Sequence, residues 1–61
     1  MNAFDEAAEL VRAAMLNIAR ASGKLETQGT RHEKPLEYYE LNKVWLQLEE
    51  LTRDLDRKAR V

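Results

Sequence analysis

The side chains that could perform acid–base or nucleophilic chemistry are few in this chain, and they do not form a recognisable catalytic set. The sequence has no cysteine and a single histidine, His32, with Glu33 and Glu37 close to it. These residues fall in or near a connection between predicted helices, and a connection of this kind does not preorganise an acid–base set. No Ser/His/Asp or Cys/His arrangement, Gly-rich phosphate loop or pair of pocket carboxylates is evident. We therefore expect a protein that is not an enzyme and that uses no metal or cofactor.

Length and composition predict one small domain, covering residues 1–61, that gains stability by self-association. Chains this short are marginally stable alone and usually need disulfides, metals or a partner subunit. Lys and Arg number 10 and Asp and Glu number 11, so the net charge of −1 makes nucleic acid an unlikely partner. No apolar run is long enough to span a membrane, and the N-terminus, with its early acids, does not resemble a signal peptide. We expect a cytoplasmic protein.

The first half of the chain predicts an amphipathic helix over about residues 3–27. Asn2 can cap its first turn, with Asp5 three residues later. Gly29 is the expected stop after the helix. The apolar positions repeat with spacings of three and four, as in a heptad pattern; they are Phe4, Ala7, Val11, Ala14, Ile18, Ala21 and Leu25.

The second half predicts another helix over about residues 35–59, after a connection of about 28–34. Thr30 and Glu33 fit a capping box, but Pro35 fits a first helical position better than a fifth, so the start at Pro35 is favoured. One face of this helix carries an apolar seam at helical spacing, formed by Leu41, Val44, Leu48, Leu51 and Leu55.

Together these elements predict an all-α fold, an antiparallel two-helix hairpin that dimerises into a four-helix bundle. A hairpin buries one seam and leaves its flanks exposed, and a second copy would cover them. The residues expected in the core or the dimer contact are Phe4, Val11, Ile18, Leu41, Val44, Leu48, Leu51 and Leu55.

The side of the second helix away from its seam also carries apolar residues. Tyr39 and Leu46 lie roughly 150–170° from the centre of the seam and share a stripe with Asn42 and Arg53. A Tyr, an Arg and an aliphatic residue with polar neighbours match the composition of a small protein interface. Scattered surface residues are the ordinary alternative. Leu16 on the first helix has the same two interpretations.

Tyr38 and Trp45 lie on the flank of the predicted seam, roughly 90–110° from its centre. They fill the dimer interface, or they anchor a partner, since Tyr and Trp are frequent hot-spot residues. Both roles are compatible if the two aromatic residues line a groove between subunits.

The basic C-terminal end contains Arg53, Arg57, Lys58 and Arg60, with acids interleaved among them. Cations at this end complement the helix dipole, and the pairs Glu49–Arg53 and Asp54–Lys58 are spaced for ion pairing along the helix. Phosphate binding by this end is the alternative.

The stretch Leu36-Glu37-Tyr38-Tyr39-Glu40-Leu41-Asn42-Lys43-Val44-Trp45-Leu46, with the Ala-rich first helix around Leu10-Val11-Arg12, resembles the anti-quorum-sensing proteins of Pseudomonas phages. The resemblance implies a dimeric helical hairpin that binds a LuxR-type quorum-sensing activator and stops it acting on DNA. It also implies binding to the type IV pilus assembly ATPase, which blocks pilus-dependent superinfection. It would make Tyr39, Trp45 and Leu46 partner contacts.

The functional prediction is a non-enzymatic inhibitor that occludes a larger host protein, such as a transcriptional activator or an ATPase, with its second helix. The contact residues predicted are Tyr39, Leu46, Trp45, Tyr38, Asn42 and Arg53. Two alternatives remain at this point: a structural adaptor whose outer residues contact further copies of itself, and a small bundle that binds RNA or DNA.

Overall fold

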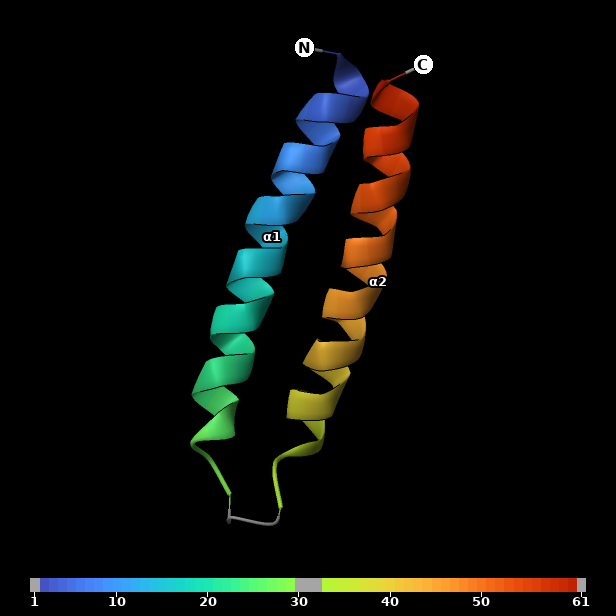
Figure 1. Ribbon diagram of the computed structural model, residues 1–61. Helices are drawn as coiled ribbons and strands as arrows, with labels where there is room; N and C mark the ends of the chain where they lie inside the picture. The colour runs from blue at the N-terminus through green and yellow to red at the C-terminus, as the bar shows by residue number, and fades with distance from the viewer. Residues whose placement is uncertain (1, 30–32, 61) are drawn as a thin grey trace.

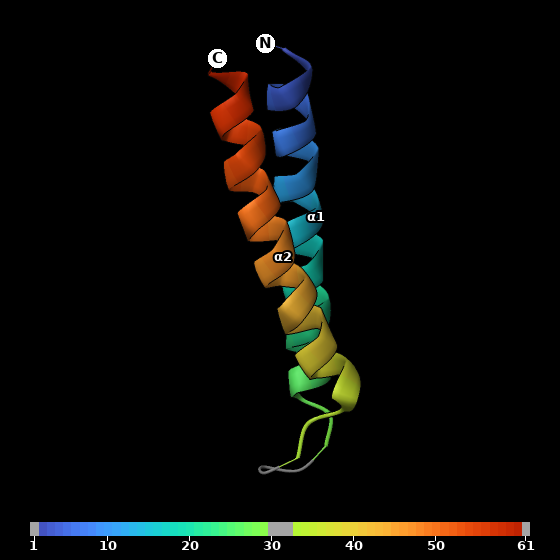
Figure 2. The same cartoon turned by 90° about the vertical axis from the view of Figure 1, so that its right-hand side faces the viewer.

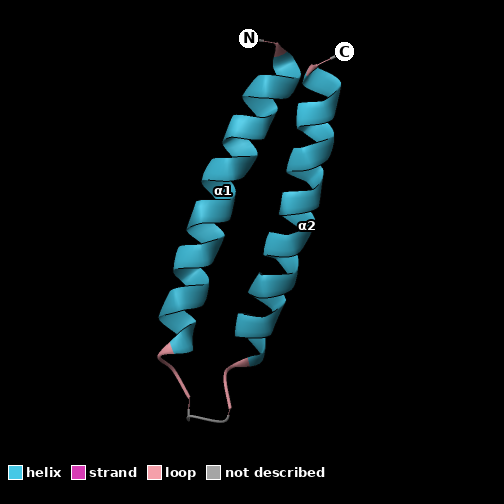
Figure 3. Cartoon of the chain, in the orientation of Figure 1, coloured by secondary structure: helices cyan, strands magenta, loops and turns pink. Residues whose placement is uncertain are grey.

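The computed structural model describes residues 2–29 and 33–60 of the chain as two helices, α1 (Ala3–Glu26) and α2 (Leu36–Ala59), and no strand among these residues. The helices lie side by side and antiparallel, with both ends of the chain at one end and the connection at the other (Figures 1 and 2). Figure 3 shows how little of the described chain lies outside helix. The predicted all-helical hairpin is confirmed, while pairing of two hairpins into a bundle lies beyond a single chain.

Local chemistry explains where α1 begins and ends. The Asn2 side chain accepts a hydrogen bond from the Asp5 backbone N–H at 3.0 Å, and the Asp5 carboxylate accepts one from the Asn2 N–H, which completes a capping box. At the other end, the Lys34 ammonium donates to the Glu26 carbonyl at 2.6 Å. Gly29 follows with a φ of 86°, the left-handed conformation expected of a stop signal. The helix ends one residue before the predicted boundary.

The start of α2 differs slightly from the prediction. Pro35 is the N-cap residue, and Leu36 is the first helical residue. Pro35 has no side-chain capping hydrogen bond, but its carbonyl accepts from the Tyr38 N–H at 3.0 Å. The possible capping box of Thr30 and Glu33 includes Thr30, which lies outside the described part of the chain. His32 lies outside it as well.

The rows that face each other between the helices are rotated from the predicted seams. In α1 the more buried positions repeat every three or four residues, and in α2 they do the same. Since each helix has only the other to cover it, these positions mark the contact. The facing row of α1 is Ala8, Val11, Met15, Ile18, Ser22 and Leu25, and that of α2 is Tyr38, Leu41, Trp45, Leu48, Thr52, Leu55 and Ala59.

This rotation corrects several sequence-based assignments. Val11, Ile18, Leu41, Leu48 and Leu55 are half-buried between the helices, as predicted. Four other residues of the predicted seams are exposed in the single chain: Ala14, Val44 (38% exposed), Phe4 (43%) and Leu51 (46%). Phe4 lies four residues before Ala8, in line with the facing row, but it is in the first turn of α1, where α2 is ending.

Tyr38 and Trp45 were predicted on the flank of the second helix, and that placement is wrong. Both are half-buried in the facing row. The physical reason is their size: the two aromatic side chains bury more apolar surface against α1 than Val44 and Leu51 would. Turning Tyr38 and Trp45 inward carries Val44 and Leu51 to the side.

Two polar residues occupy facing positions that the sequence did not predict. Ser22 and Thr52 are each 8% exposed. The Ser22 hydroxyl donates to the Asn42 side-chain oxygen at 3.4 Å, and the Thr52 hydroxyl donates to the Leu48 carbonyl at 2.8 Å. With these bonds made, neither hydroxyl is buried without a partner, which is why the seam tolerates both residues.

Candidate protein-interaction surfaces

The hairpin has two different sides. Residues one position before a facing residue lie on one side of both helices, because the helices are antiparallel and of the same hand. On α1 this row is alanine, at residues 7, 14 and 21, before the facing positions 8, 15 and 22. On α2 it contains Val44 and Leu51, before Trp45 and Thr52. We call this side the apolar face; it consists of Ala7, Ala14, Ala21, Val44 and Leu51.

The apolar face extends beyond those five residues at its α1 edge. Leu10 lies three residues after Ala7 and four before Ala14, so it shares their stretch of helix surface. It is 73% exposed. Leu10, Ala14, Val44 and Leu51 are exposed in the single chain, whereas Ala7 and Ala21 are half-buried.

The opposite side, the polar face, is formed by residues one position after the facing row. Arg12 follows Val11 and Asp56 follows Leu55, and the Arg12 guanidinium donates to the Asp56 carboxylate across the two helices. This contact independently places the two rows on one side. The pair is partly exposed, so it contributes little to stability, on the order of 1 kcal/mol or less.

A shallow groove of about 210 Å³ runs between the helices on the polar face. Trp45 and Ile18 come from the facing rows, while Ala19 and Gly23 keep the α1 wall low. A Cβ atom added at Gly23 would meet no other atom within 4 Å. The full lining is Ile18, Ala19, Ser22, Gly23, Glu26, Asn42 and Trp45.

Tyr39 and Leu46 lie at the outer edge of the polar face on α2, each one residue after a facing aromatic residue. They are 49% and 61% exposed, as the sequence predicted for an outward stripe. The Tyr38 and Tyr39 rings meet edge to face with centroids 5.3 Å apart, so the outer ring is held against the half-buried one. We call Tyr39 and Leu46 the outer stripe.

The other predicted contact residues are distributed around this stripe. Asn42 lines the groove and accepts the Ser22 hydrogen bond. Arg53 continues the row of Tyr39 and Leu46, but its guanidinium donates to Glu49 at 2.9 Å, which is the predicted ion pair. Leu16, 54% exposed, borders the polar face from α1. Trp45 is half-buried and lines the same groove.

The basic C-terminal end of α2 is poorly suited to binding an anion, because most of its charges are paired. Arg57 lies 3.7 Å from Asp54, so this carboxylate pairs three residues along and not with Lys58 as predicted. The depression lined by Arg53, Asp56, Arg57 and Arg60 has a volume of about 320 Å³, and it includes an acid and two paired arginines. Its field is therefore largely cancelled.

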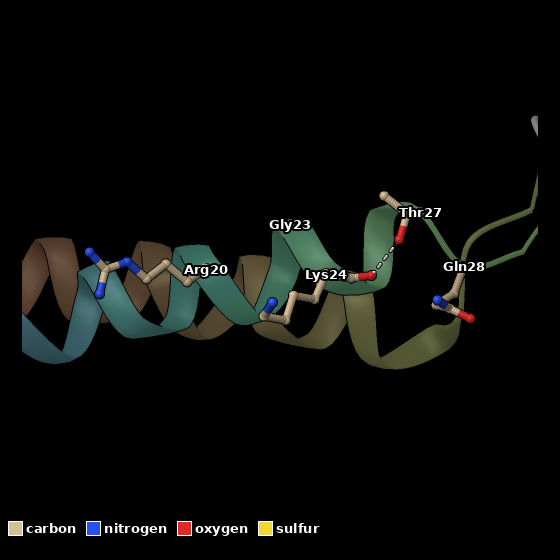
Figure 4. A pocket seen from close by; sticks show the side chains of 5 residues that line it. All are labelled: Arg20, Gly23, Lys24, Thr27 and Gln28. Carbon is tan, nitrogen blue, oxygen red and sulfur yellow. Dashed lines mark hydrogen bonds between the residues drawn. The ribbon is translucent and has the colours of Figure 1, made fainter.

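A second depression lies beside the C-terminal turns of α1 (Figure 4). Arg20 and Lys24 extend along the same stretch of helix, and the Thr27 hydroxyl donates to the Lys24 carbonyl at 2.9 Å. Gly23 and Gln28 complete the lining. Arg20 and Lys24 lie towards the C-terminal end of α1, where cations complement the negative end of the helix dipole.

Among residues 2–29 and 33–60, no cluster of three or more His, Cys, Asp or Glu side chains is placed to hold a metal ion. In the same part of the chain, neither helix is apolar enough along its length to cross a bilayer. No family model, curated protein or solved structure matches the chain. The described residues present two distinct surfaces: an apolar face on one side, and a groove with an outer stripe on the other.

Proposed function

We propose that this chain is a non-enzymatic protein-binding module that inhibits a larger protein by covering part of its surface. It acts as a homodimer in the form of a four-helix bundle, in the cytoplasm of a cell. The outer stripe of α2, with the groove beside it, contacts the target. Occlusion of a DNA-binding or assembly surface needs no chemistry from the bound module.

The observation that supports this proposal is the exposure of Tyr39 and Leu46, two turns apart on α2. Each follows a half-buried aromatic residue in the sequence, and the Tyr39 ring also packs edge to face against Tyr38. Tyr is enriched among the residues that dominate binding energy in protein interfaces. Trp45 and Asn42 lie within the adjoining groove, where a partner side chain would reach them.

The resemblance to phage anti-quorum-sensing proteins suggests two classes of target to test first. One is a LuxR-type transcriptional activator, and the other is the ATPase that assembles type IV pili. We propose the activator as the principal target, with loss of its DNA binding as the consequence, and superinfection exclusion through the ATPase as a second activity.

The test is capture of a target by the tagged protein, with variants that separate the stripe from the fold. Tyr39→Ala/Leu46→Ala should remain a folded dimer, since surface substitutions usually change stability by within about 0.5 kcal/mol. It should lose about 1–3 kcal/mol of target binding if either residue is a hot spot. Leu36→Ala, at a position 70% exposed on the same helix, is the matched control and should bind normally. Equal binding by all three proteins would refute the role of the stripe.

An assembly adaptor is a second candidate, because exposed apolar residues occur on both sides of the hairpin. Val44 and Leu51 lie on one side, and Leu46 and Leu16 on the other. Growth beyond a dimer as concentration rises, abolished by Leu46→Asp, would favour it over inhibition. A nucleic-acid function would require a steep loss of affinity with added salt, and the balanced charge of the chain disfavours it.

A further inference from the structure

The single hairpin has almost no core of its own. Ala8, the only fully buried apolar residue among those described, is also one of the smallest side chains. No large side chain in the same ranges is fully buried. Two helices of this length therefore leave most of their apolar surface partly wet. Domains this small usually need disulfides, a metal or a partner subunit, and this chain has no cysteine for a disulfide.

The apolar face is the surface on which that burial is available. Its central residues carry no charge, and Val44 and Leu51 remain 38% and 46% exposed. The charged members of the same α2 row are Glu37 and Glu40 before Val44, and Asp54 and Lys58 after Leu51, so the stretch between Val44 and Leu51 is uncharged. A second copy of this chain presents the same uncharged stretch, so each copy can bury the exposed apolar surface of the other.

The register of the hairpin aligns small and large residues on this face. Ser22 contacts Asn42 and Met15 contacts Thr52 across the helices. Because Ala21 and Ala14 precede the α1 members of these pairs, Ala21 lies about level with Val44 and Ala14 about level with Leu51. These two layers of the face thus each have an alanine on α1 and a larger side chain on α2.

We propose that the apolar face packs on the same face of a second copy, with the two-fold axis parallel to the helices and both connections at the same end. The proposal rests on the dimer of the proposed function and specifies its arrangement. In this arrangement α1 of each copy lies on α2 of the other copy. Because the two-fold axis is parallel to the helices, each residue keeps its position along the helix axis. Ala14 then meets Leu51 and Ala21 meets Val44 of the second copy, so small side chains receive large ones in both helix contacts.

Charge favours the same arrangement. Lys24 lies three residues after Ala21, and Glu40 lies four residues before Val44, so both border the apolar face. Neither makes an ion pair within the described part of the chain. With the connections together, Lys24 of each copy lies near Glu40 of the other. A two-fold axis across the helices would instead stack Leu51 on Val44 and alanine on alanine, and would bring Glu40 near Asp54.

The first test is sedimentation equilibrium of the full chain. The wild type should have twice the chain mass of 7.1 kDa. Val44→Asp/Leu51→Asp should raise the dimer dissociation constant by about 100-fold or more, because each dimer would contain four unpaired charges in an apolar contact. Tyr39→Asp/Leu46→Asp is the control on the opposite side and should remain dimeric. A monomeric wild type, or loss of the dimer in the control alone, would overturn the proposal.

The second test leaves the apolar face intact, so it does not depend on whether the charged variant folds. The chain lacks cysteine, so Leu36→Cys, at an exposed site near the connection, takes a single spin label. Labelled protein is mixed with isotope-enriched wild type, and broadening of amide signals is measured. Broadening should be strongest near the connection of the unlabelled copy. Strongest broadening near Ala3, about 36 Å away along the helix, would overturn the arrangement.

Failure of this proposal and failure of the proposed function give different results. A dimer of the predicted arrangement that captures no target would refute inhibition and leave the dimer intact. Target capture by a monomer, or by a dimer with its connections at opposite ends, would refute the arrangement and leave inhibition intact.

Discussion

Replacing Gly23 by alanine should stabilise the protein. Gly23 lies inside α1, where glycine costs roughly 0.5–1 kcal/mol relative to alanine. The methyl group has room, because nothing outside the helix backbone lies within 4 Å of the added Cβ. The substitution should therefore recover about 0.5–1 kcal/mol per chain, with no loss of packing. For a domain of this size, that corresponds to a rise in Tm of about 2–8 °C.

Gly29→Ala is the matched control, because it adds the same atom at a different backbone conformation. Gly29 has a φ of 86°, and its added Cβ would collide with the Glu33 carbonyl oxygen. A non-glycine residue in the left-handed region costs on the order of 1–2 kcal/mol before any collision. This variant should therefore have a lower Tm than the wild type.

Thermal unfolding followed by circular dichroism, at one fixed protein concentration, measures both effects. Concentration must be fixed because self-association shifts the Tm. A lower Tm for Gly23→Ala would refute the reasoning, since it would mean that the position is crowded by a second copy or is not regular helix. A higher Tm combined with weaker target capture would indicate that the target enters the groove beside Trp45.

Three further experiments test the contacts that position the two faces. Asn2→Ala should lower the free energy of unfolding, measured in urea, by about 1 kcal/mol. It removes the capping box and the 3.1 Å hydrogen bond from the Asn2 amide to the Ala59 carbonyl. No change would mean that the cap does not form. A double-mutant cycle on Arg12→Ala and Asp56→Ala should give a coupling energy of about 0.2–1 kcal/mol that declines with salt, and a coupling well above that would show that the pair is buried in solution. Thr52→Val should raise the free energy of unfolding by up to about 1 kcal/mol, because a buried methyl group replaces the hydroxyl. The Leu48 carbonyl, which accepts the hydroxyl hydrogen bond, keeps its backbone hydrogen bond within the helix. A clear loss of stability would show that the hydroxyl contacts are needed.

The helices could be predicted from the sequence because their signals are local. The capping residue Asn2, the punctuation at Gly29 and Pro35, and the three–four apolar repeat each depend on neighbouring residues alone. Those signals placed the helix ends within about one residue of where the structure has them. The outward position of Tyr39 and Leu46 followed from the same periodicity.

The rotation of the helices could not be predicted in the same way, because both helices have more apolar residues than one contact can cover. On α1 the wholly apolar row through Ala7, Ala14 and Ala21 was a better sequence pattern than the row that includes Ser22. The outcome depended on tertiary contacts: Tyr38 and Trp45 turned inward, and hydrogen bonds satisfied Ser22 and Thr52. The predicted seams now lie partly on the apolar face, where a four-helix bundle would need them.

The two sides of the hairpin are proposed to have separate roles, and one sedimentation equilibrium experiment tests that separation most directly. It compares the wild type with Val44→Asp/Leu51→Asp and with Tyr39→Ala/Leu46→Ala. The wild type and the outer-stripe variant should sediment at twice 7.1 kDa, about 14.2 kDa, and the apolar-face variant at 7.1 kDa. A dimer that survives the apolar-face substitutions but dissociates when the outer stripe is changed would contradict the account, because it would reverse the roles of the two sides.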